Sequence, residues 1–228
     1  MKVSVTVRIR GAPEGTASVG VIGSSSSSSS SSNHCSPSSG EKSISFPGHN
    51  SNTFTFDNII DGSASQSDVF DTAAEPLVVD ALNGINCTLF TYGQTGSGKT
   101  YTMQGGSGED KGIIPRTAYM ILSELERRKG DNAITSYEFK LSVLEIYKER
   151  LFDLLSAPGS SKDSNRLLRI REHMGSVWVE GLVEQQCSTP KEFTDLTARY
   201  QLLFVPFLWC FSLRNTGRQN DAKLAVTQ

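Results

Sequence analysis

The sequence is poor in cysteine, and its cysteines are too far apart to form a metal-binding pair. None of the four, Cys35, Cys87, Cys187 and Cys210, belongs to a C-x-x-C motif, so we expect neither a zinc site nor a disulfide framework. The net charge of only −2 gives no support to nucleic-acid binding. A signal peptide is not apparent at the N-terminus, and the apolar stretch 202–211 is shorter than the roughly 20 residues of a membrane span. We therefore expect a protein of the cytoplasm that binds neither nucleic acid nor membrane.

Length and composition are those of a globular protein with two unusual segments. The chain has 228 residues, 37% hydrophobic and 20% charged, which suffices for one large domain or two small ones. Residues 15–52 include the serine run Ser24–Ser32 and little that could be buried, so we predict a flexible, disordered surface loop. Residues 198–215 are atypically apolar. A buried strand is one interpretation, but Pro206 disfavours a central strand, and we expect this segment to be foreign to the fold.

Strands and helices are predicted to alternate along the rest of the chain. Apolar and polar residues alternate in the predicted strands, and apolar residues recur at three- and four-residue spacing in the predicted helices. We predict strands at 3–9, 53–59, 87–92 and 137–143, helices at 67–84, 113–130, 148–155 and 189–203, and a hairpin at 166–182. This alternation is typical of an α/β sandwich.

The stretch FTYGQTGSGKTYTM, residues 90–103, contains the phosphate-loop motif G-x-x-x-x-G-K-[ST]. Glycine backbone N–H groups can curl around phosphate oxygens where a Cβ atom would block the approach. Lys99 is expected to reach the β- and γ-phosphates, and the Thr100 hydroxyl to bind Mg²⁺. A predicted strand before the loop and a helix beginning near Gly98 complete the setting. Asp80 also follows an apolar run, but it precedes the loop within a helical pattern, so we predict a surface residue.

Four stretches together resemble the kinesin motor domain, the microtubule-stimulated ATPase of the cytoskeleton. They are FDNIIDGSASQSDVFDTAAEPLVVDALNGINCTLFTYGQTGSGKTYTMQG, GIIPR, VLEIYKERLFDLL and REHMGSVWVEGL. The likeness runs from about Val3 to Leu196, with the serine-rich segment as an insertion. It implies a P-loop NTPase fold, a three-layer sandwich with a mixed central sheet, and the microtubule (tubulin) as partner. Residues 1–228 would then form one partial motor domain located on the cytoskeleton.

The resemblance also implies ATP and Mg as cofactors. The cofactor-binding residues would be Gly93, Gln94, Thr95, Gly96, Ser97, Gly98, Lys99 and Thr100, with Thr100 also on the metal. Arg8 and Tyr101 would flank the adenine, as the matching kinesin positions do. The family's R-x-R-P pattern is incomplete because Gly11 stands in place of the proline, which thins one wall of the adenine pocket.

The predicted hairpin has two interpretations. Its Arg169, Arg171 and His173 correspond to a part of kinesin that contacts tubulin. An ordinary solvated β-turn with scattered charges would have the same sequence character. The sequence leaves both interpretations open.

Kinesins hydrolyse ATP with two later elements similar to SSRSH and DLAGSE, and neither occurs in these 228 residues. Residues Thr216–Gln228 resemble the segment just before the first of them. Because phosphoryl transfer depends on positioning and electrostatics, we expect a truncated motor domain that binds ATP and contains no catalytic residue for its hydrolysis.

Three functional interpretations follow. The first is a kinesin-like microtubule motor present as an incomplete motor domain. The second is a nucleotide-binding product without motor activity. The third is an unrelated P-loop phosphotransferase with Glu145 as the magnesium-side acid, which would make the long kinesin-like stretches a coincidence.

Overall fold

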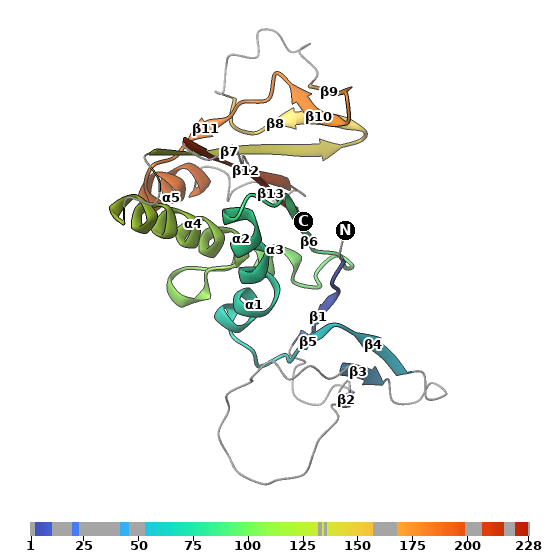
Figure 1. The fold of residues 1–228 in the computed structure, drawn as a ribbon. Helices are drawn as coiled ribbons and strands as arrows, with labels where there is room; N and C mark the ends of the chain where they lie inside the picture. Colours follow the sequence, from blue (N-terminus) through green and yellow to red (C-terminus); the bar gives the residue numbers. More distant parts are fainter. Residues whose placement is uncertain are drawn as a thin grey trace.

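The computed structural model describes residues 3–10, 20–22, 42–45, 53–131, 134, 136–156, 168–198, 207–216 and 222–227. Strands and helices alternate along this part of the chain (Figure 1). In chain order the elements are β1 (Thr6–Arg8), β2 (Gly20–Ile22), β3 (Lys42–Ser45), β4 (Thr53–Phe56), β5 (Asn58–Ile60), α1 (Gln66–Ala73), α2 (Glu75–Leu82), β6 (Cys87–Phe90), α3 (Lys99–Met103), the 3₁₀ turn η1 (Gly108–Asp110), α4 (Ile113–Gly130), β7 (Ser136–Tyr147), β8 (Arg150–Asp153), β9 (Arg169–His173), β10 (Ser176–Glu180), β11 (Gln185–Gln186), α5 (Pro190–Ala198), β12 (Phe207–Thr216) and β13 (Ala222–Thr227).

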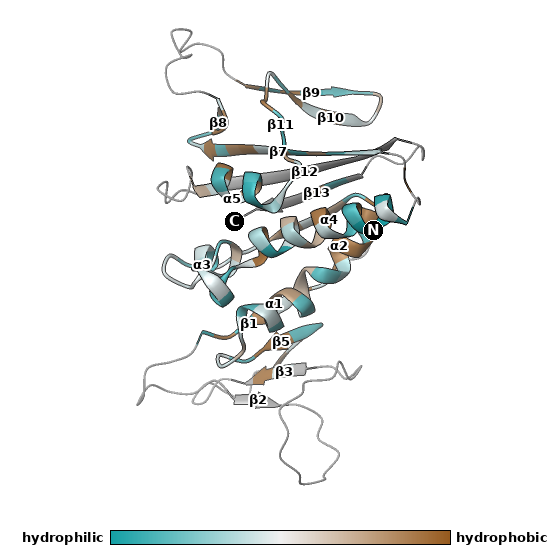
Figure 2. Cartoon of the chain, turned by 90° about the vertical axis from the view of Figure 1, so that its left-hand side faces the viewer, coloured by the Kyte–Doolittle hydropathy of each residue, from teal (hydrophilic) through white to brown (hydrophobic). Residues whose placement is uncertain are grey.

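A six-stranded mixed sheet organises the molecule. Its order is β11-β7-β12-β13-β6, with β8 paired to β7, and β13 runs parallel to β6 whereas the other pairs are antiparallel. Helices α2, α4 and α5 lie on one face of this sheet (Figures 1 and 2). Smaller sheets are formed by β1 with β5, by β2, β3 and β4, and by β9 with β10. The predicted α/β class with a mixed sheet is confirmed, and of its three layers the sheet and one helical layer lie within the described residues.

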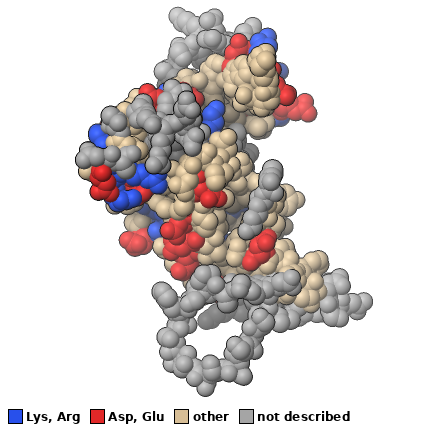
Figure 3. Space-filling model, viewed as in Figure 1, with Lys and Arg blue, Asp and Glu red and all other residues tan. Residues whose placement is uncertain are grey.

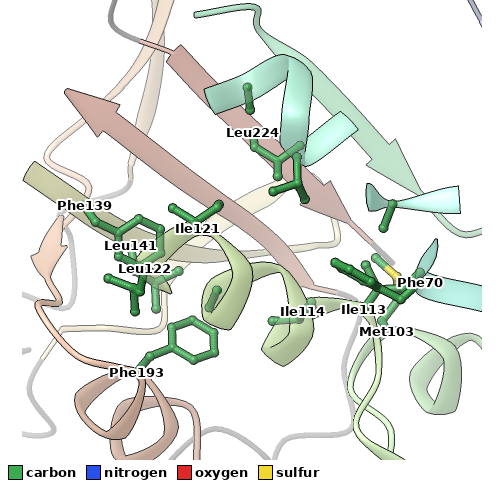
Figure 4. Packing of buried hydrophobic residues seen from close by; sticks show 14 of the residues in the cluster. Phe70, Met103, Ile113, Ile114, Ile121, Leu122, Phe139, Leu141, Phe193 and Leu224 are labelled. Atoms are coloured by element: carbon green, nitrogen blue, oxygen red, sulfur yellow. The ribbon is translucent and has the colours of Figure 1, made fainter. Parts of the chain in front are cut away.

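The core lies between α4 and strand β7. Phe139, Leu141 and Val143 alternate along β7 and are fully buried, as the period of a strand requires. From α4, the helical spacing directs Ile121 and Leu122 onto this surface (Figure 4). Burying each such side chain contributes about 1.5–3 kcal/mol, so this layer supplies much of the stability that holds the neighbouring loops in place.

Helix α4 ends in a charged cluster. Arg127 and Arg128 both bind the Glu124 carboxylate, at 2.7 and 2.8 Å, and Arg128 also donates to the Leu82 carbonyl at the end of α2. Lysine and arginine atoms gather beside acidic ones at this end of the helix in Figure 3. The cluster therefore ties α4 to α2 besides compensating the helix dipole. Among the described helices, none is long and apolar enough to cross a membrane.

The loop predicted at 15–52 contains two short strands and is to that extent wrong. Strand β2 (Gly20–Ile22) pairs with β3 (Lys42–Ser45), and β3 pairs with β4. Ile44 is only 4% exposed, so this segment does bury an apolar side chain. The serine run Ser24–Ser32 lies outside the described residues, and its predicted disorder stays a prediction.

The short helix expected at 148–155 is a strand. Residues Arg150–Asp153 form β8, which pairs with the end of β7 through a two-residue turn. Lys148 and Glu149 occupy this turn with φ angles of 48° and 63°. Two consecutive left-handed residues give the twist that joins antiparallel strands closely, so the chain reverses here and does not continue as a helix.

The helix expected at 67–84 is divided in two. Helix α1 begins at Gln66, one residue before the predicted start, and its N-cap Ser65 forms a capping box with Asp68. The break at Ala74 precedes Pro76, whose missing N–H is tolerated in the first turn of α2. The predicted cap of α5 is confirmed by the hydrogen bond from the Glu192 N–H to Thr189 Oγ1 at 3.1 Å.

The apolar segment 198–215 is partly inside the fold. Residues Phe207–Thr216 form β12, which pairs with β7 over ten positions and with β13 on its other side. The expectation that Pro206 keeps this segment out of a central position is therefore wrong, because the strand begins directly after the proline. Residues 199–206 lie outside the described part of the chain.

Candidate nucleotide-binding site

The phosphate loop lies where the motif requires, between strand β6 and helix α3. Gly96 and Gly98 have φ angles of 81° and 100°, a left-handed conformation that side chains rarely adopt. A Cβ atom added to Gly93 would lie 2.6 Å from Ser97 Oγ and 3.2 Å from Ser97 Cβ, so a side chain there would force Ser97 to move. Gly96 and Gly98 are thus required by their backbone conformation and Gly93 by the nearby Ser97 side chain, and together they let the backbone form a concave turn suited to an anion.

Lys99 is held by the loop that it follows. Its Nζ atom donates hydrogen bonds to the carbonyl oxygens of Gly93 and Gln94, both at 2.9 Å. Lys99 and Thr100 are half-buried and form the first two residues of α3. Since α3 has only five residues, we attribute attraction for an anion to the lysine and the loop N–H groups more than to a helix dipole.

Arg8 and Tyr101, 93 positions apart in sequence, are brought together. The Arg8 guanidinium lies 5.3 Å from the centre of the Tyr101 ring, within the range of a cation–π contact. Its Nη1 atom donates to Thr102 Oγ1 at 2.8 Å and to Gln66 Oε1 at 2.9 Å. Pairing of β1 with β5 aligns Arg8 opposite Ile60 and so fixes the backbone from which it reaches α3. Burial lowers the pKa of Arg8 below its ordinary value, and Tyr101 opposes part of that shift. Gly11, expected to thin the adenine pocket, lies outside the described residues.

Two residues at this site were missed in the sequence. Gln66 is 3% exposed, and its Nε2 donates to the Tyr101 carbonyl oxygen at 2.6 Å. Its signal was a polar residue at helical spacing from the buried Val69 and Phe70. Arg10 donates to the Gly96 carbonyl oxygen at 2.6 Å. Its signal was the R-x-R pattern, in which Arg10 stands two residues after Arg8.

The residues present suit a magnesium ion that arrives with a nucleotide. No cluster of three or more histidine, cysteine, aspartate or glutamate side chains that could hold a metal occurs in the described part of the chain. Mg²⁺ in nucleotide sites keeps several waters and takes one or two protein ligands besides the phosphates. One hydroxyl, that of Thr100, agrees with this donor set. Asp80 is an exposed residue of α2, as predicted.

Glu145 does not lie beside the phosphate loop. It belongs to β7, which is separated from β6 by β12 and β13. Three strand spacings amount to about 14 Å, too far for a ligand shared with Thr100. The phosphotransferase interpretation therefore loses its proposed acid.

The hairpin predicted within 166–182 is confirmed as β9 and β10, joined through Met174 and Gly175 at positive φ. Arg171 is paired with Glu180 at 2.9 Å across the two strands, while Arg169 and His173 are exposed. Contact with tubulin and an ordinary solvated hairpin both agree with this geometry.

Comparison with known proteins identifies relatives of one kind. The family model of the kinesin motor domain matches residues 21–201. The Kinesin-like protein KIN-5A of Arabidopsis thaliana is 40% identical over 151 residues, which cover 61% of this chain and 14% of that protein. The Kinesin heavy chain of Neurospora crassa is 41% identical over 150 residues, covering 64% and 15%, and the human Kinesin-like protein KIF15 is 40% identical over 148 residues, covering 61% and 10%. The chain thus matches a small part of each of these relatives.

A solved structure supports the same conclusion about the fold. The motor domain of the Kar3-like kinesin from Ashbya gossypii superposes with a TM-score of 0.75 at 22% identity, covering 98% of this chain and 68% of that one. At this identity the likeness supports the fold alone. The family match extends over well more than half of the chain and includes the phosphate loop. The protein belongs to the kinesin motor domain family, a family of microtubule motors.

Proposed function

We propose that residues Gly93 to Thr100 bind the terminal phosphates of Mg·ATP. The observation that carries this proposal is the position of Lys99, whose ammonium is held 2.9 Å from two carbonyl oxygens of the loop itself. Phosphate oxygens carry full charge and form stronger hydrogen bonds with an ammonium group than carbonyl oxygens do. When nucleotide binds, Lys99 would therefore donate to phosphate oxygens in place of the loop carbonyl oxygens. The loop N–H groups would donate to the remaining phosphate oxygens. Thr100 would supply one oxygen to the Mg²⁺ ion that the nucleotide carries.

We further propose that the adenine packs on Tyr101. Because Arg8 already covers one side of the ring at 5.3 Å, the base cannot enter between these two side chains as they stand. Tyr101 is 48% exposed, which leaves apolar ring surface for an adenine to stack upon. Arg8 would then support the ring from behind and contribute charge near the base.

By family, the protein would act on microtubules in the cytoplasm, as kinesins generally do. We propose that the 228 residues, tested by themselves, bind nucleotide without turning it over at a useful rate. They contain no stretch similar to SSRSH or DLAGSE. Phosphoryl transfer needs groups that orient the attacking water and hold the metal, and a phosphate loop alone supplies neither. A nucleotide-binding chain without motor activity is thus the function that these residues support by themselves.

Isothermal titration with Mg·ATP and Mg·ADP tests nucleotide binding directly. We expect saturable heat for the wild type and a loss of at least about a hundredfold in affinity for Lys99→Met, because the variant removes the phosphate-binding charge. Lys191→Met, at an exposed lysine of α5, is the matched control and should bind like the wild type. No heat from a folded wild type, or equal affinity for Lys99→Met, would refute the phosphate-loop assignment.

ATP turnover on microtubules tests the second part of the proposal. We expect the 228-residue chain to release phosphate at the background rate, with or without polymerised tubulin. Turnover well above background that disappears in Lys99→Met would show that hydrolysis needs no further elements. That result would overturn the expectation of a hydrolysis-deficient chain while leaving nucleotide binding intact.

A further inference from the structure

Gln66 is a buried polar residue whose side chain is not needed to cap its own helix. It is the first residue of α1, but the cap of that helix is complete without it. Ser65 accepts from the Asp68 N–H, and the Asp68 carboxylate accepts from the Ser65 N–H at 2.8 Å. Gln66 is only 3% exposed, so its amide is shielded from water. Burying an amide is costly unless its N–H donors and its oxygen form hydrogen bonds within the protein.

The Gln66 amide joins three segments that are distant in sequence. Its Oε1 accepts a hydrogen bond from Arg8 on β1 at 2.9 Å. Its Nε2 donates to the carbonyl oxygen of Tyr101 on α3 at 2.6 Å and to that of Asp110 in η1 at 3.2 Å. A glutamine amide offers two N–H donors and one oxygen, so both donors and the acceptor are occupied. The orientation of the amide is consequently fixed.

Both side chains proposed to meet the base depend on this amide. Arg8 is partly desolvated, and its two hydrogen-bond acceptors in the described part of the chain are Gln66 and Thr102. Those two bonds hold the guanidinium above the Tyr101 ring. The backbone of Tyr101 is held by Gln66 itself, and its hydroxyl lies 3.4 Å from an Asp110 carboxylate oxygen. Loss of the amide would leave Arg8 with Thr102 as its one acceptor in the described part of the chain and would remove a restraint on the Tyr101 backbone, so both side chains would be less firmly positioned.

The phosphate side of the site is anchored separately. Lys99 is bound by Gly93 and Gln94, and Gly96 by Arg10, with no hydrogen bond from Gln66 to any of them. We propose that Gln66 is a positioning residue for the base side of the nucleotide site: it sets how much the base, and not the phosphates, adds to affinity. This inference rests on the proposed function, in which the loop binds phosphates and Tyr101 meets the base.

A change at Gln66 should affect the binding of two ligands differently when these ligands differ only by the nucleoside. Isothermal titration of the 228-residue chain with Mg·ATP and with Mg·tripolyphosphate compares them. Gln66→Leu keeps the size of the side chain and removes all three hydrogen bonds. We expect this variant to lower the affinity for Mg·ATP by about tenfold and to leave the affinity for Mg·tripolyphosphate unchanged. A tenfold change in affinity is about what the loss of a hydrogen bond to a charged group causes.

A conservative variant distinguishes positioning of Arg8 from general packing. Gln66→Glu keeps an oxygen that can accept from Arg8 but loses both N–H donors. We therefore expect an intermediate effect, a loss of about threefold in the affinity for Mg·ATP. Gln185→Leu, at an exposed glutamine of β11, is the matched control and should bind both ligands like the wild type.

Each outcome bears on the proposal. Unchanged tripolyphosphate binding by Gln66→Leu also shows that the variant is folded. Equal losses of affinity for the two ligands would overturn the proposal, because Gln66 would then support the fold as a whole. No loss of affinity for Mg·ATP would also overturn it, because Gln66 would then have no role in binding the base. A folded wild type that binds neither ligand would refute the proposed function itself, and this inference with it.

Discussion

The guanidinium of Arg10 donates a hydrogen bond of 2.6 Å to the carbonyl oxygen of Gly96, in the middle of the phosphate loop. Strand β1 ends at Arg8, two residues before Arg10, and pairs with β5, not with the six-stranded sheet. Arginine side chains from this N-terminal segment therefore contact both the loop and the helix that follows it. Arg8 anchors the helix that follows the loop, and Arg10 anchors the loop itself.

Replacing Arg10 by alanine should weaken Mg·ATP binding modestly and in a salt-dependent way. The side chain is exposed, and exposed charge interactions contribute about 0.2–1 kcal/mol, so we expect a loss of about twofold to fivefold. Because salt screens exposed charges, the loss should shrink as ionic strength rises from about 0.01 M to 1 M. Titrations at several salt concentrations measure this. Arg169→Ala, at an exposed arginine of β9, should show no effect, and a loss independent of salt would contradict a charge mechanism.

Gly98→Ala should destabilise the phosphate loop through the backbone alone. Gly98 has a φ angle of 100°, and a Cβ atom added there would meet nothing within 4 Å. The variant therefore suffers no clash, and a left-handed alanine costs about 1–2 kcal/mol. We expect a lower free energy of unfolding in urea and weaker Mg·tripolyphosphate binding.

The control for this variant is Gly130→Ala at the end of α4. A Cβ atom there also meets nothing within 4 Å, but Gly130 is not left-handed. Alanine should leave stability unchanged or raise it by about 0.4–1 kcal/mol, because it restricts the unfolded chain. If the two glycine variants changed the free energy of unfolding by the same amount, a side chain at Gly98 would not strain the loop.

The phosphate loop could be predicted because its function depends on local backbone geometry. Gly93, Gly98 and Lys99 stand at fixed spacing, and each has its reason within eight residues of chain. The strand β7 was predictable for a similar reason, since Phe139 and Leu141 alternate with more polar neighbours. In both cases the sequence pattern is itself the periodicity of the structure.

Features that depend on distant partners could not be predicted. Nothing near Gln66 indicates that its amide meets Arg8, 58 positions earlier, or the Tyr101 carbonyl, 35 positions later. The sequence predicts a helix in place of strand β8, since Leu151, Leu154 and Leu155 also fit helical spacing. No glycine or asparagine marked the turn before it. A tight turn made of a lysine and a glutamate is unusual, and pairing with β7 decided the outcome.

Glu124→Gln should lower stability at neutral pH but not in acid. Hydrogen bonds from Arg127 and then Arg128 lower the pKa of Glu124 from 4.5 to about 2. A carboxylate with a lowered pKa in the folded state stabilises the protein above its unfolded pKa, and the contribution is lost as the pH falls from about 4.5 to about 2. Because Arg127 is 61% exposed, solvent reduces the effect to about 1 kcal/mol or less.

Urea unfolding between pH 7 and pH 3 measures this difference. The gap between Glu124→Gln and the wild type should be largest at pH 7 and should close progressively below about pH 4.5. Glu184→Gln, at an exposed carboxylate between β10 and β11, should show a small gap that does not follow this course. A gap for Glu124→Gln that persists unchanged at pH 3 would mean that the variant acts through packing and not through the ion pairs.

Glu149→Gly should stabilise the protein, because the turn between β7 and β8 holds a glutamate in a conformation that glycine prefers. Tyr147 pairs with Arg150, and the two residues between them both have positive φ, the pattern that favours asparagine followed by glycine. Relief of left-handed strain, less the entropy of a freer unfolded chain, should raise the free energy of unfolding by about 0.5–1 kcal/mol. Lys148→Asn should raise it less, since Lys148 lies 5.2 Å from the Tyr147 ring centre and that cation–π contact would be lost. Urea unfolding ranks the two variants, and a destabilised Glu149→Gly would show that the glutamate side chain has a role outweighing its strain.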